Sequence, residues 1–331
     1  MRLLIATDAC FPQINGVVRC IAMWAEAAER RGVSVILITS DGFPTIPLPT
    51  YSSIRIALPR KEVISDMISQ VRPDAIHIAT EGPVGFAVRR YCIGLGRRFT
   101  TYFHTRFPDY VTARFPIPQT WIWKYLRQFH RPSSLVMVGT QALAGELIHL
   151  GFSNVVVAPP GVDTDFFHPR LRVDLELQHP IFLSSGRLAP EKNTAAFLKL
   201  DLPGTKIVIG DGPQKASLVR KYRDALFFGA IADLDLARFY ASADVFVFPS
   251  RTDTFGLVML EALASGLPIA ASGSQASREM VRGENIGAIE ENLGSACMKA
   301  IHMSRRACRE AALDHTWDRS ARRFLDYAIT S

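Results

Sequence analysis

The chain of 331 residues exceeds the ~250–300 residues at which a single hydrophobic core usually stops growing, which favours two domains of similar size. Its residues are 48% hydrophobic and 21% charged, as in a globular protein, and no apolar run approaches the ~20 residues that span a bilayer. The five cysteines are odd in number and form no C-x-x-C pair, which argues against a disulfide framework and a zinc site. The short apolar run of residues 3–6 ends before Asp8, so it indicates a buried first strand and not a secretory signal, and we expect a cytosolic location.

The formal net charge of +7 is concentrated in the first half of the chain. Residues 1–165 hold 17 Lys and Arg against 12 Asp and Glu, and within them residues 55–131 hold 13 against 5. This excess predicts a basic surface that faces something anionic, with an ordinary solvated basic face as the alternative.

Short β-branched runs alternate with segments of helical period through the first half. The expected strands are residues 2–6, 33–38, 74–78, 99–103, 134–138 and 154–157, and the expected helices are residues 17–31, 84–97, 118–131 and 140–150. This alternation predicts one parallel sheet covered by helices on both faces.

A stretch rich in proline and glycine from Pro159 to Pro169 indicates a linker, after which the alternation restarts. The expected strands of the second half are residues 181–184, 206–209, 225–228, 245–248 and 268–271, and residues 316–329 form an amphipathic closing helix. We therefore expect an α/β protein with an N-terminal Rossmann-like domain over residues 1–165, a second over 166–313, and a helix over 314–331 that packs back on the first. Ligands of such sheets bind beyond the carboxyl ends of the strands, so two facing domains would place a cleft between those ends.

The loop after the first strand brings Gly16 to the start of a helix, where free backbone N–H groups and partial positive charge attract anions. Alone this signal is weak, and a purely structural turn is the alternative. The loop lacks both G-x-G-x-x-G and the P-loop pattern, which counts against a dehydrogenase and an NTPase.

Two cations, Arg187 and Lys192, follow the first strand of the second half. A guanidinium fork with an ammonium group neutralises a diphosphate and stabilises its departure, although two solvated basic side chains are the alternative. Beyond the next strand, Gly210 and Gly212 form a tight turn that either approaches a ligand or is only a turn.

The most specific stretch follows the strand at residues 245–248. Asp253 comes after that strand, and a helix expected from Phe255 carries Glu261 about two turns later. Both acids can then point into one cleft while the amides of Phe255, Gly256 and Leu257 meet an anion. A helix cap with a surface glutamate is the alternative.

Taken together, these segments resemble the retaining glycosyltransferases of the large group-one class, often called family four, which have the GT-B fold. The resemblance covers nearly the whole chain and rests on the following segments: Pro12-x-x-Asn15-Gly16-Val17, Phe103-His104-Thr105, Gly161-Val162-Asp163 with Phe167-His168-Pro169, Gly186-Arg187 with Glu191-Lys192-Asn193, Gly210-Asp211-Gly212-Pro213, and Asp253 with Glu261.

The resemblance implies a role for each matching residue. Arg187 and Lys192 would hold the donor diphosphate, and Glu261 would accept hydrogen bonds from the ribose hydroxyls. Asp253 stands where many members have Glu and would contact the donor sugar. The remaining donor-side residues are Gly16, Gly210, Gly212, Phe255, Gly256 and Leu257, and His104 matches the histidine near the anomeric centre.

The resemblance also implies a reaction that needs neither a protein nucleophile nor a metal ion, because the leaving phosphate can take the proton of the acceptor hydroxyl. Two D-x-D sequences, at residues 163–165 and 233–235, fall in the linker and at a helix start, where we expect structural roles. Arg106, Asp109 and Tyr110 are acceptor-side guesses, because nothing in their spacing shows such a role.

The segment of residues 117–131 mixes aromatic and basic side chains, which suits contact with an anionic membrane surface. We expect a peripheral protein on the cytoplasmic face of the membrane that moves a hexose or uronic acid from a UDP-sugar to a lipid such as diacylglycerol. The alternatives are a GDP-mannose-dependent α-mannosyltransferase and a basic nucleic-acid-binding protein, the latter leaving Arg187, Lys192 and both acids unexplained.

Overall fold

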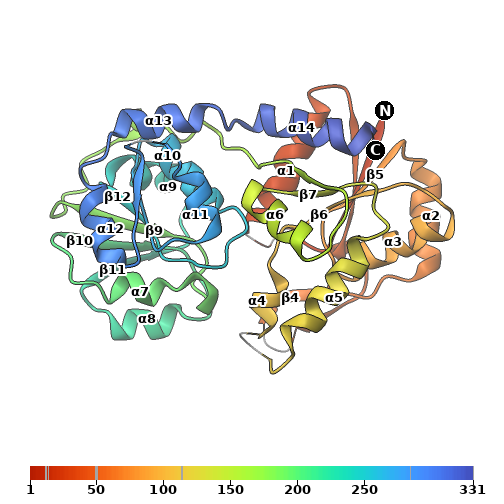
Figure 1. Ribbon diagram of the computed structural model, residues 1–331, viewed down its shortest axis with the longest axis horizontal. Helices are drawn as coiled ribbons and strands as arrows, with labels where there is room; N and C mark the ends of the chain where they lie inside the picture. Colours follow the sequence, from red (N-terminus) through yellow and green to blue (C-terminus); the bar gives the residue numbers. More distant parts are fainter. Residues whose placement is uncertain (12, 14, 49–50, 113–114, 284, 331) are drawn as a thin grey trace. The chain divides into compact units, whose positions relative to one another are not determined.

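The computed structural model describes residues 1–11, 13, 15–48, 51–112, 115–283 and 285–330, which form two compact units (Figure 1). The first unit holds Met1–Pro160 with Trp317–Ser331, and the second holds Gly161–Thr316. The second unit thus begins five residues before the start expected at residue 166. It ends three residues after the end expected at residue 313. The reason is that Val162 pairs with Thr316 in an isolated bridge and donates its N–H to His315 O at 2.7 Å, so the start of the linker belongs to the second unit.

The first unit is built on a six-stranded parallel sheet with the order β2-β1-β5-β6-β7-β8. Its strands are β1 (Arg2–Thr7), β2 (Ser34–Thr39), β5 (Ala75–Ile78), β6 (Thr100–Tyr102), β7 (Val136–Val138) and β8 (Val155–Val157). Its helices are α1 (Gly16–Glu29), α2 (Lys61–Val71), α3 (Pro83–Gly94), α4 (Phe107–Thr112), α5 (Gln119–His130), α6 (Gln141–His149) and α14 (Trp317–Thr330), with a 3₁₀ turn η1 (Ser40–Gly42).

Alternating side chains of the central strands explain the two helical layers of this unit. Leu4 and Ala6 of β1 face a core that includes residues of α2 and α3. On the other face, Trp24 of α1 stacks on Phe324 of α14 with ring centroids 4.5 Å apart, and its indole N–H donates to Ser320 at 2.9 Å. The closing helix therefore packs on the first unit.

Residues 40–73 contain elements that the hydrophobic pattern did not predict. The strands β3 (Thr45–Leu48) and β4 (Tyr51–Ala57) pair antiparallel in a separate two-stranded sheet, and α2 follows them. Helix α4 was also missed; it has six residues, too few to show a helical period.

The second unit repeats the plan with a six-stranded parallel sheet in the order β11-β10-β9-β12-β13-β14. Its strands are β9 (Ile181–Ser185), β10 (Thr205–Ile209), β11 (Ala225–Gly229), β12 (Val245–Phe248), β13 (Ile269–Ala271) and β14 (Gly287–Ile289). Its helices are α7 (Thr194–Leu198), α8 (Lys215–Lys221), α9 (Asp233–Ser242), α10 (Leu257–Ala264), α11 (Gln275–Met280), α12 (Leu293–Ala300) and α13 (Arg305–Leu313), with 3₁₀ turns η2 (Pro169–Leu171) and η3 (Pro190–Lys192).

Both faces of this second sheet are buried, which is why its strands are continuous hydrophobic runs. Leu183 and Phe246 belong to a core that includes residues of α9, α10 and α13, whereas Phe182 and Val247 belong to one with residues of α7, α8 and α12. Strand β14 was not predicted; the short stretch around Gly287 forms the edge strand beside β13. Over the residues described, no helix has the length and apolar character needed to cross a membrane.

Candidate functional site

The chain reverses its direction of travel across the second sheet between β9 and β12, which lie side by side. Loops that leave the carboxyl ends of two such strands diverge, and ligands of doubly wound folds bind at that point. One loop holds Arg187, which is half-buried, and Lys192 of η3; the other holds Asp253. The structure thus brings three predicted site residues to the switch point of one sheet.

Lys192 and Asp253 form an ion pair between their Nζ and Oδ1 atoms across the two loops. Their side chains are 29% and 12% exposed, and Asn193 Nδ2 donates to Pro249 O at 3.3 Å, which ties the same loops together. The second carboxylate oxygen of Asp253 is buried and has no hydrogen-bond partner among the described residues. A buried acceptor that lacks a donor is costly, so this oxygen is suited to a ligand hydroxyl.

Glu261 lies on α10 and is 5% exposed. Tyr240 of α9 donates its hydroxyl to Glu261 Oε2 at 3.2 Å, and Ser185 at the end of β9 bonds to the same tyrosine hydroxyl. Sequence reasoning missed Tyr240 and Ser185, because a tyrosine on an amphipathic helix looks like any other core aromatic residue. The chain of hydroxyl groups fixes the direction in which the Glu261 carboxylate points.

The N-terminus of α10 is the helix end at which the sequence predicts an anion. The helix begins at Leu257, two residues later than expected, and Gly256 precedes it with φ of 82°. This φ lies in the left-handed region that favours glycine. Gly256 at the N-cap position has no side chain that could bond to the first amides of the helix. The ring of Phe255 itself is 7% exposed and belongs to the core, so only its backbone is suited to the predicted contact.

The predicted glycine turn, in contrast, has a structural explanation. At Gly210, where φ is 136°, a Cβ would lie 1.9 Å from Gly186 O, and at Gly212 a Cβ would lie 2.5 Å from Leu188 O. These glycines let the loops after β9 and β10 lie against each other. Their contacts are with Gly186 and Leu188, the residues on either side of Arg187.

In the first unit, Gly16 is the first residue of α1, as expected. The preceding Asn15 accepts hydrogen bonds from Val17 N and Val18 N at 3.0 Å each, so two of the amides that an anion could use are occupied. Pro12 of the same predicted loop lies outside the described residues.

The switch point of the first sheet, between β1 and β5, holds a carboxylate of the chain itself. Asp8 accepts from Thr80 Oγ1 and Val84 N at 2.9 Å each and from Gly85 N at 3.3 Å, at the start of α3. Burial raises the pKa of Asp8, although these hydrogen bonds oppose the rise. Asp8 thus occupies the amides at the start of α3, where an anionic ligand would otherwise bind.

His104 follows β6, and its ring stacks on Tyr102 with centroids 3.9 Å apart. Burial, with a smaller contribution from nearby His77, lowers the pKa of His104 to about 3. The imidazole is therefore neutral at physiological pH, so it can act as a hydrogen-bonding group and brings no positive charge to a reacting centre.

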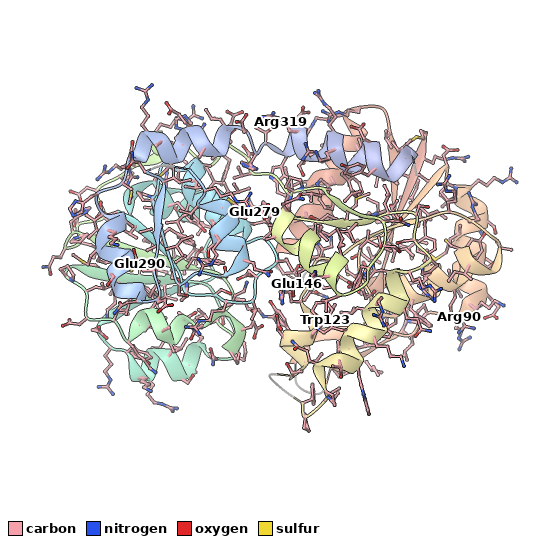
Figure 2. The ribbon with its side chains drawn as sticks, in the orientation of Figure 1. Arg90, Trp123, Glu146, Glu279, Glu290 and Arg319 are labelled. Carbon is pink, nitrogen blue, oxygen red and sulfur yellow. The ribbon has the colours of Figure 1, made fainter. Side chains whose placement is uncertain are left out.

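The acceptor-side guesses form an ion-pair cluster. Arg106 bonds to Glu146 of α6 at 2.6 and 2.9 Å and to Asp109 at 2.6 Å, and Figure 2 labels Glu146. Burial alone would lower the pKa of Arg106, but the bonds to Glu146 and Asp109 raise it above its ordinary value. Asp109 also accepts from Gln119 at 2.8 Å, so the cluster joins α4, α5 and α6. Tyr110 lies on α4 beside it, and a role in acceptor binding stays a prediction for all three residues.

Neither D-x-D sequence has the surroundings of a metal site. Asp163 Oδ1 accepts from Asp165 N at 3.1 Å and Phe166 N at 2.9 Å, whereas Asp233 and Asp235 lie in the first turn of α9. Across the described ranges, no three His, Cys, Asp or Glu side chains gather closely enough to hold a metal ion.

His77 of β5 gives the first unit a predictable acid sensitivity. The residue is 0% exposed, donates to or accepts from Thr100 Oγ1 through Nδ1 at 2.8 Å, and meets Phe324 edge-on at 4.9 Å. Burial lowers its pKa from 6.5 to about 3, so between these pH values the unfolded chain binds a proton that the folded chain does not. The contribution of His77 to the free energy of unfolding is therefore fully present above pH 6.5 and decreases as the pH falls toward 3. At pH 5 the loss from this residue is about 2 kcal/mol.

Urea unfolding of wild type and His77→Asn at pH 7 and pH 5 measures this effect. The variant should lose about 2 kcal/mol less than wild type on acidification. His149→Asn, which changes an exposed histidine of the same unit, serves as the control and should keep the wild-type pH dependence. Equal losses in wild type and His77→Asn would contradict the assignment.

Two family models match the chain, one in each unit. "Glycosyltransferase Family 4" matches residues 14–166, and "Glycosyl transferases group 1" matches residues 179–302. Among solved structures, sucrose-phosphate synthase from Thermosynechococcus elongatus superimposes with a TM-score of 0.78 at 18% identity over 98% of both chains. A protein of Anabaena in complex with UDP-glucose does so with a TM-score of 0.73 at 16% identity over 99% of both chains. These likenesses establish a GT-B fold.

Curated relatives agree with the family models. A sulfoquinovosyl transferase of Arabidopsis thaliana is 32% identical over 79% of this chain and 57% of its own, so the chain spans little more than half of that enzyme. A GDP-mannose-dependent α-mannosyltransferase of Mycobacterium tuberculosis is 27% identical over 96% of this chain and 93% of its own. An α-monoglucosyldiacylglycerol synthase of Streptococcus pneumoniae is 26% identical over 91% and 78%.

The two family models and the curated relatives define a glycosyltransferase that uses a nucleotide sugar. The chain belongs to the group-one glycosyltransferases, with a family-four domain in its first half.

Proposed function

We propose that the protein transfers a hexose or uronic acid, with retention of configuration, from a UDP-sugar to a lipid acceptor such as diacylglycerol. The main support for a nucleotide-sugar substrate is the Lys192–Asp253 ion pair at the switch point of the second sheet. The second carboxylate oxygen of Asp253 is buried there without a hydrogen-bond partner among the described residues. A cation for phosphate and an acceptor for a sugar hydroxyl then lie side by side. The UDP-glucose complex of the Anabaena structure and the name of the Streptococcus relative support this choice of donor and acceptor.

In this proposal Arg187, Lys192 and the first amides of α10 bind the diphosphate, and Glu261 binds the ribose. The bond between the anomeric carbon and the diphosphate oxygen breaks as the acceptor oxygen attacks from the same face. The charge that develops on the leaving diphosphate is balanced by the two cations and the helix N-terminus. The leaving phosphate oxygen takes the acceptor proton, so the scheme requires no metal ion or other cofactor.

On the first unit, we propose neutral His104 and the start of α1 at Gly16 as further contacts of the substrates. A neutral imidazole can hydrogen-bond to a sugar hydroxyl without repelling the positive charge that develops at the anomeric carbon. Gly16, which is exposed, leaves room for a sugar or phosphate near the helix start.

The lipid acceptor implies contact with a membrane, and α5 is the element we propose for it. Trp121 is 69% exposed and Tyr125 45% exposed, and both lie on the helix that carries Lys124 and Arg127 and ends just before Arg131. Aromatic side chains among cations favour the interface of an anionic bilayer. We therefore place the protein on the cytoplasmic face of the membrane as a peripheral protein.

A GDP-mannose-dependent α-mannosyltransferase that acts on a lipid or a saccharide is the second candidate. The Mycobacterium relative of that name matches 93% of its own length, more than the Arabidopsis or Streptococcus relatives do. Its donor would use the same diphosphate and ribose contacts, so the base and the sugar distinguish the two candidates.

The donor is tested by thermal stabilisation of the purified chain with UDP, GDP, ADP, UDP-sugars and GDP-mannose. A ligand at 100 times its Kd stabilises the native state by about 2.7 kcal/mol, so the true donor class should raise the Tm by several degrees. A shift with uridine nucleotides supports the first candidate, and a shift confined to guanosine nucleotides supports the second. The absence of any shift would contradict the donor site at the second sheet.

A further inference from the structure

A hollow of about 520 Å³ lies on the first unit, between the second half of α5 and the segment that leads from α6 to β8. Its walls are formed by Lys124, Arg127, Gln128, His130, Arg131, Val136, Gly151, Phe152 and Ser153. Val136 begins β7, and Gly151–Ser153 precede β8, so the hollow lies at the amino edge of the sheet. His104 follows the carboxyl end of β6, at the opposite edge, and α5 with its 12 residues runs about 18 Å between these edges. The hollow is therefore separate from the candidate site.

The lysine and arginine side chains give this hollow a positive charge. Lys124 and Arg127 on α5 and Arg131 directly after it are spaced three and four residues apart, and none of the nine lining residues is acidic. Along the described chain no carboxylate forms a salt bridge with any of the three. The nearest acid on α6, Glu146, is already bonded to Arg106. Like charges in one concavity repel one another, and a bound anion reduces that repulsion.

The walls are held in place before any ligand arrives. Arg127 Nη1 donates to Leu150 O at 3.2 Å, and Arg89 fixes the end of α5 by donating to Gln128 O at 2.8 Å and Phe129 O at 2.7 Å. At the floor, His130 bonds to Glu81 at 3.1 Å and to Thr101 at 2.8 Å. A site whose walls are already ordered loses little entropy on binding.

We propose that this hollow binds a phosphate group. Arginine forks and a lysine are the side chains that bind tetrahedral phosphate oxygens, and Gln128 and Ser153 add neutral donors at the rim. The phosphate is either that of an anionic lipid headgroup or a free phosphate ion, and both present the same oxygens to the three cations. The site is independent of the sugar donor and of the transfer reaction.

The test measures binding of inorganic phosphate to the full chain by calorimetry, in an Arg187→Gln/Lys192→Gln background that disables phosphate binding at the second sheet. The double variant Lys124→Gln/Arg131→Gln changes two exposed side chains and should raise the Kd at least tenfold. Arg90→Gln/Arg98→Gln removes the same charge from exposed positions of this unit and should change the Kd less than twofold; Figure 2 labels Arg90 on α3, apart from Trp123 of α5.

A second pair of variants tests the hollow without touching its cations. Ser153→Glu places a carboxylate among the cations and should abolish phosphate binding. Ser153→Gln introduces a side chain of the same size as glutamate but without its charge, and it should bind phosphate like wild type. Nucleotide stabilisation of otherwise wild-type Ser153→Glu should be unchanged, so a failure of this proposal is distinguishable from a failure of the donor site.

Vesicle flotation identifies the source of the phosphate. Loss of binding to phosphatidylglycerol vesicles in Lys124→Gln/Arg131→Gln and Ser153→Glu, but not in the controls, assigns a lipid headgroup. Loss of inorganic phosphate binding with unchanged flotation assigns a free phosphate ion. Unchanged phosphate and vesicle binding in the hollow variants, or equal losses in the Arg90/Arg98 control, would overturn the proposal.

Discussion

Replacing Arg187 with alanine should lower kcat on the order of 10²- to 10³-fold, while the fold and the thermal stability stay close to wild type. The residue leaves the carboxyl end of β9 at the switch point of the second sheet, and it is half-buried in a loop held against Gly210 and Gly212. A guanidinium there balances the charge that appears on the leaving diphosphate, and this interaction is stronger in the transition state than in the ground state. The loss should therefore appear in kcat more than in the donor KM.

The measurement is a steady-state assay with the donor found by thermal stabilisation, run with and without EDTA. Arg187→Lys keeps the charge without the fork and should fall between wild type and alanine. Arg223→Ala, an exposed arginine of the same unit, should retain full activity. Because Arg187 and Lys192 balance the charge on the leaving diphosphate in this mechanism, EDTA should leave wild-type turnover unchanged. A strict metal requirement or a fully active Arg187→Ala would exclude the mechanism.

The sheets could be predicted because their strands are buried on both faces and so stand out as apolar runs such as Val245–Phe248. The antiparallel pair β3–β4 could not be predicted. Its segment carries Pro47 and several Ser and Thr residues, so it shows clearly neither the hydrophobic period of a strand nor that of a helix. The units divide five residues before the expected boundary because the bridge between Val162 and Thr316 joins residues distant in sequence, which a proline-rich stretch does not reveal.

Positions at strand ends made Arg187, Lys192 and Asp253 predictable, because parallel strands bring their carboxyl ends to one edge. The direct pairing of Lys192 with Asp253 depends on strand order, which puts β9 beside β12, and the sequence does not reveal that order. The same holds for Asp8, whose partners Thr80 and Val84 lie over 70 residues away. The sequence therefore predicts at which strand ends these groups lie and misses the contacts that fix them.

Glu261→Ala should raise the Kd of the preferred nucleoside diphosphate about 10- to 100-fold, since hydrogen bonds to a charged group contribute about 1.5–3 kcal/mol. The carboxylate is 5% exposed and is directed by Tyr240, whose hydroxyl lies 3.2 Å from Oε2. Inorganic pyrophosphate, which has no ribose, should bind wild type and variant alike, and so should the 2′,3′-dideoxynucleotide. Calorimetry of these three ligands separates a role in ribose recognition from general damage to the site.

Tyr240→Phe tests whether the tyrosine acts through Glu261. Removing the hydroxyl leaves the ring in the core but frees the carboxylate to rotate, so the Kd should rise only a few-fold, by about the 1 kcal/mol of one hydrogen bond. Once Glu261 is alanine, the tyrosine hydroxyl has nothing to orient, and Tyr240→Phe should add little to the loss. Additive losses in the double variant would show that Tyr240 contributes to binding on its own, and a loss of pyrophosphate binding in Glu261→Ala would indicate general damage to the site instead of a lost ribose contact.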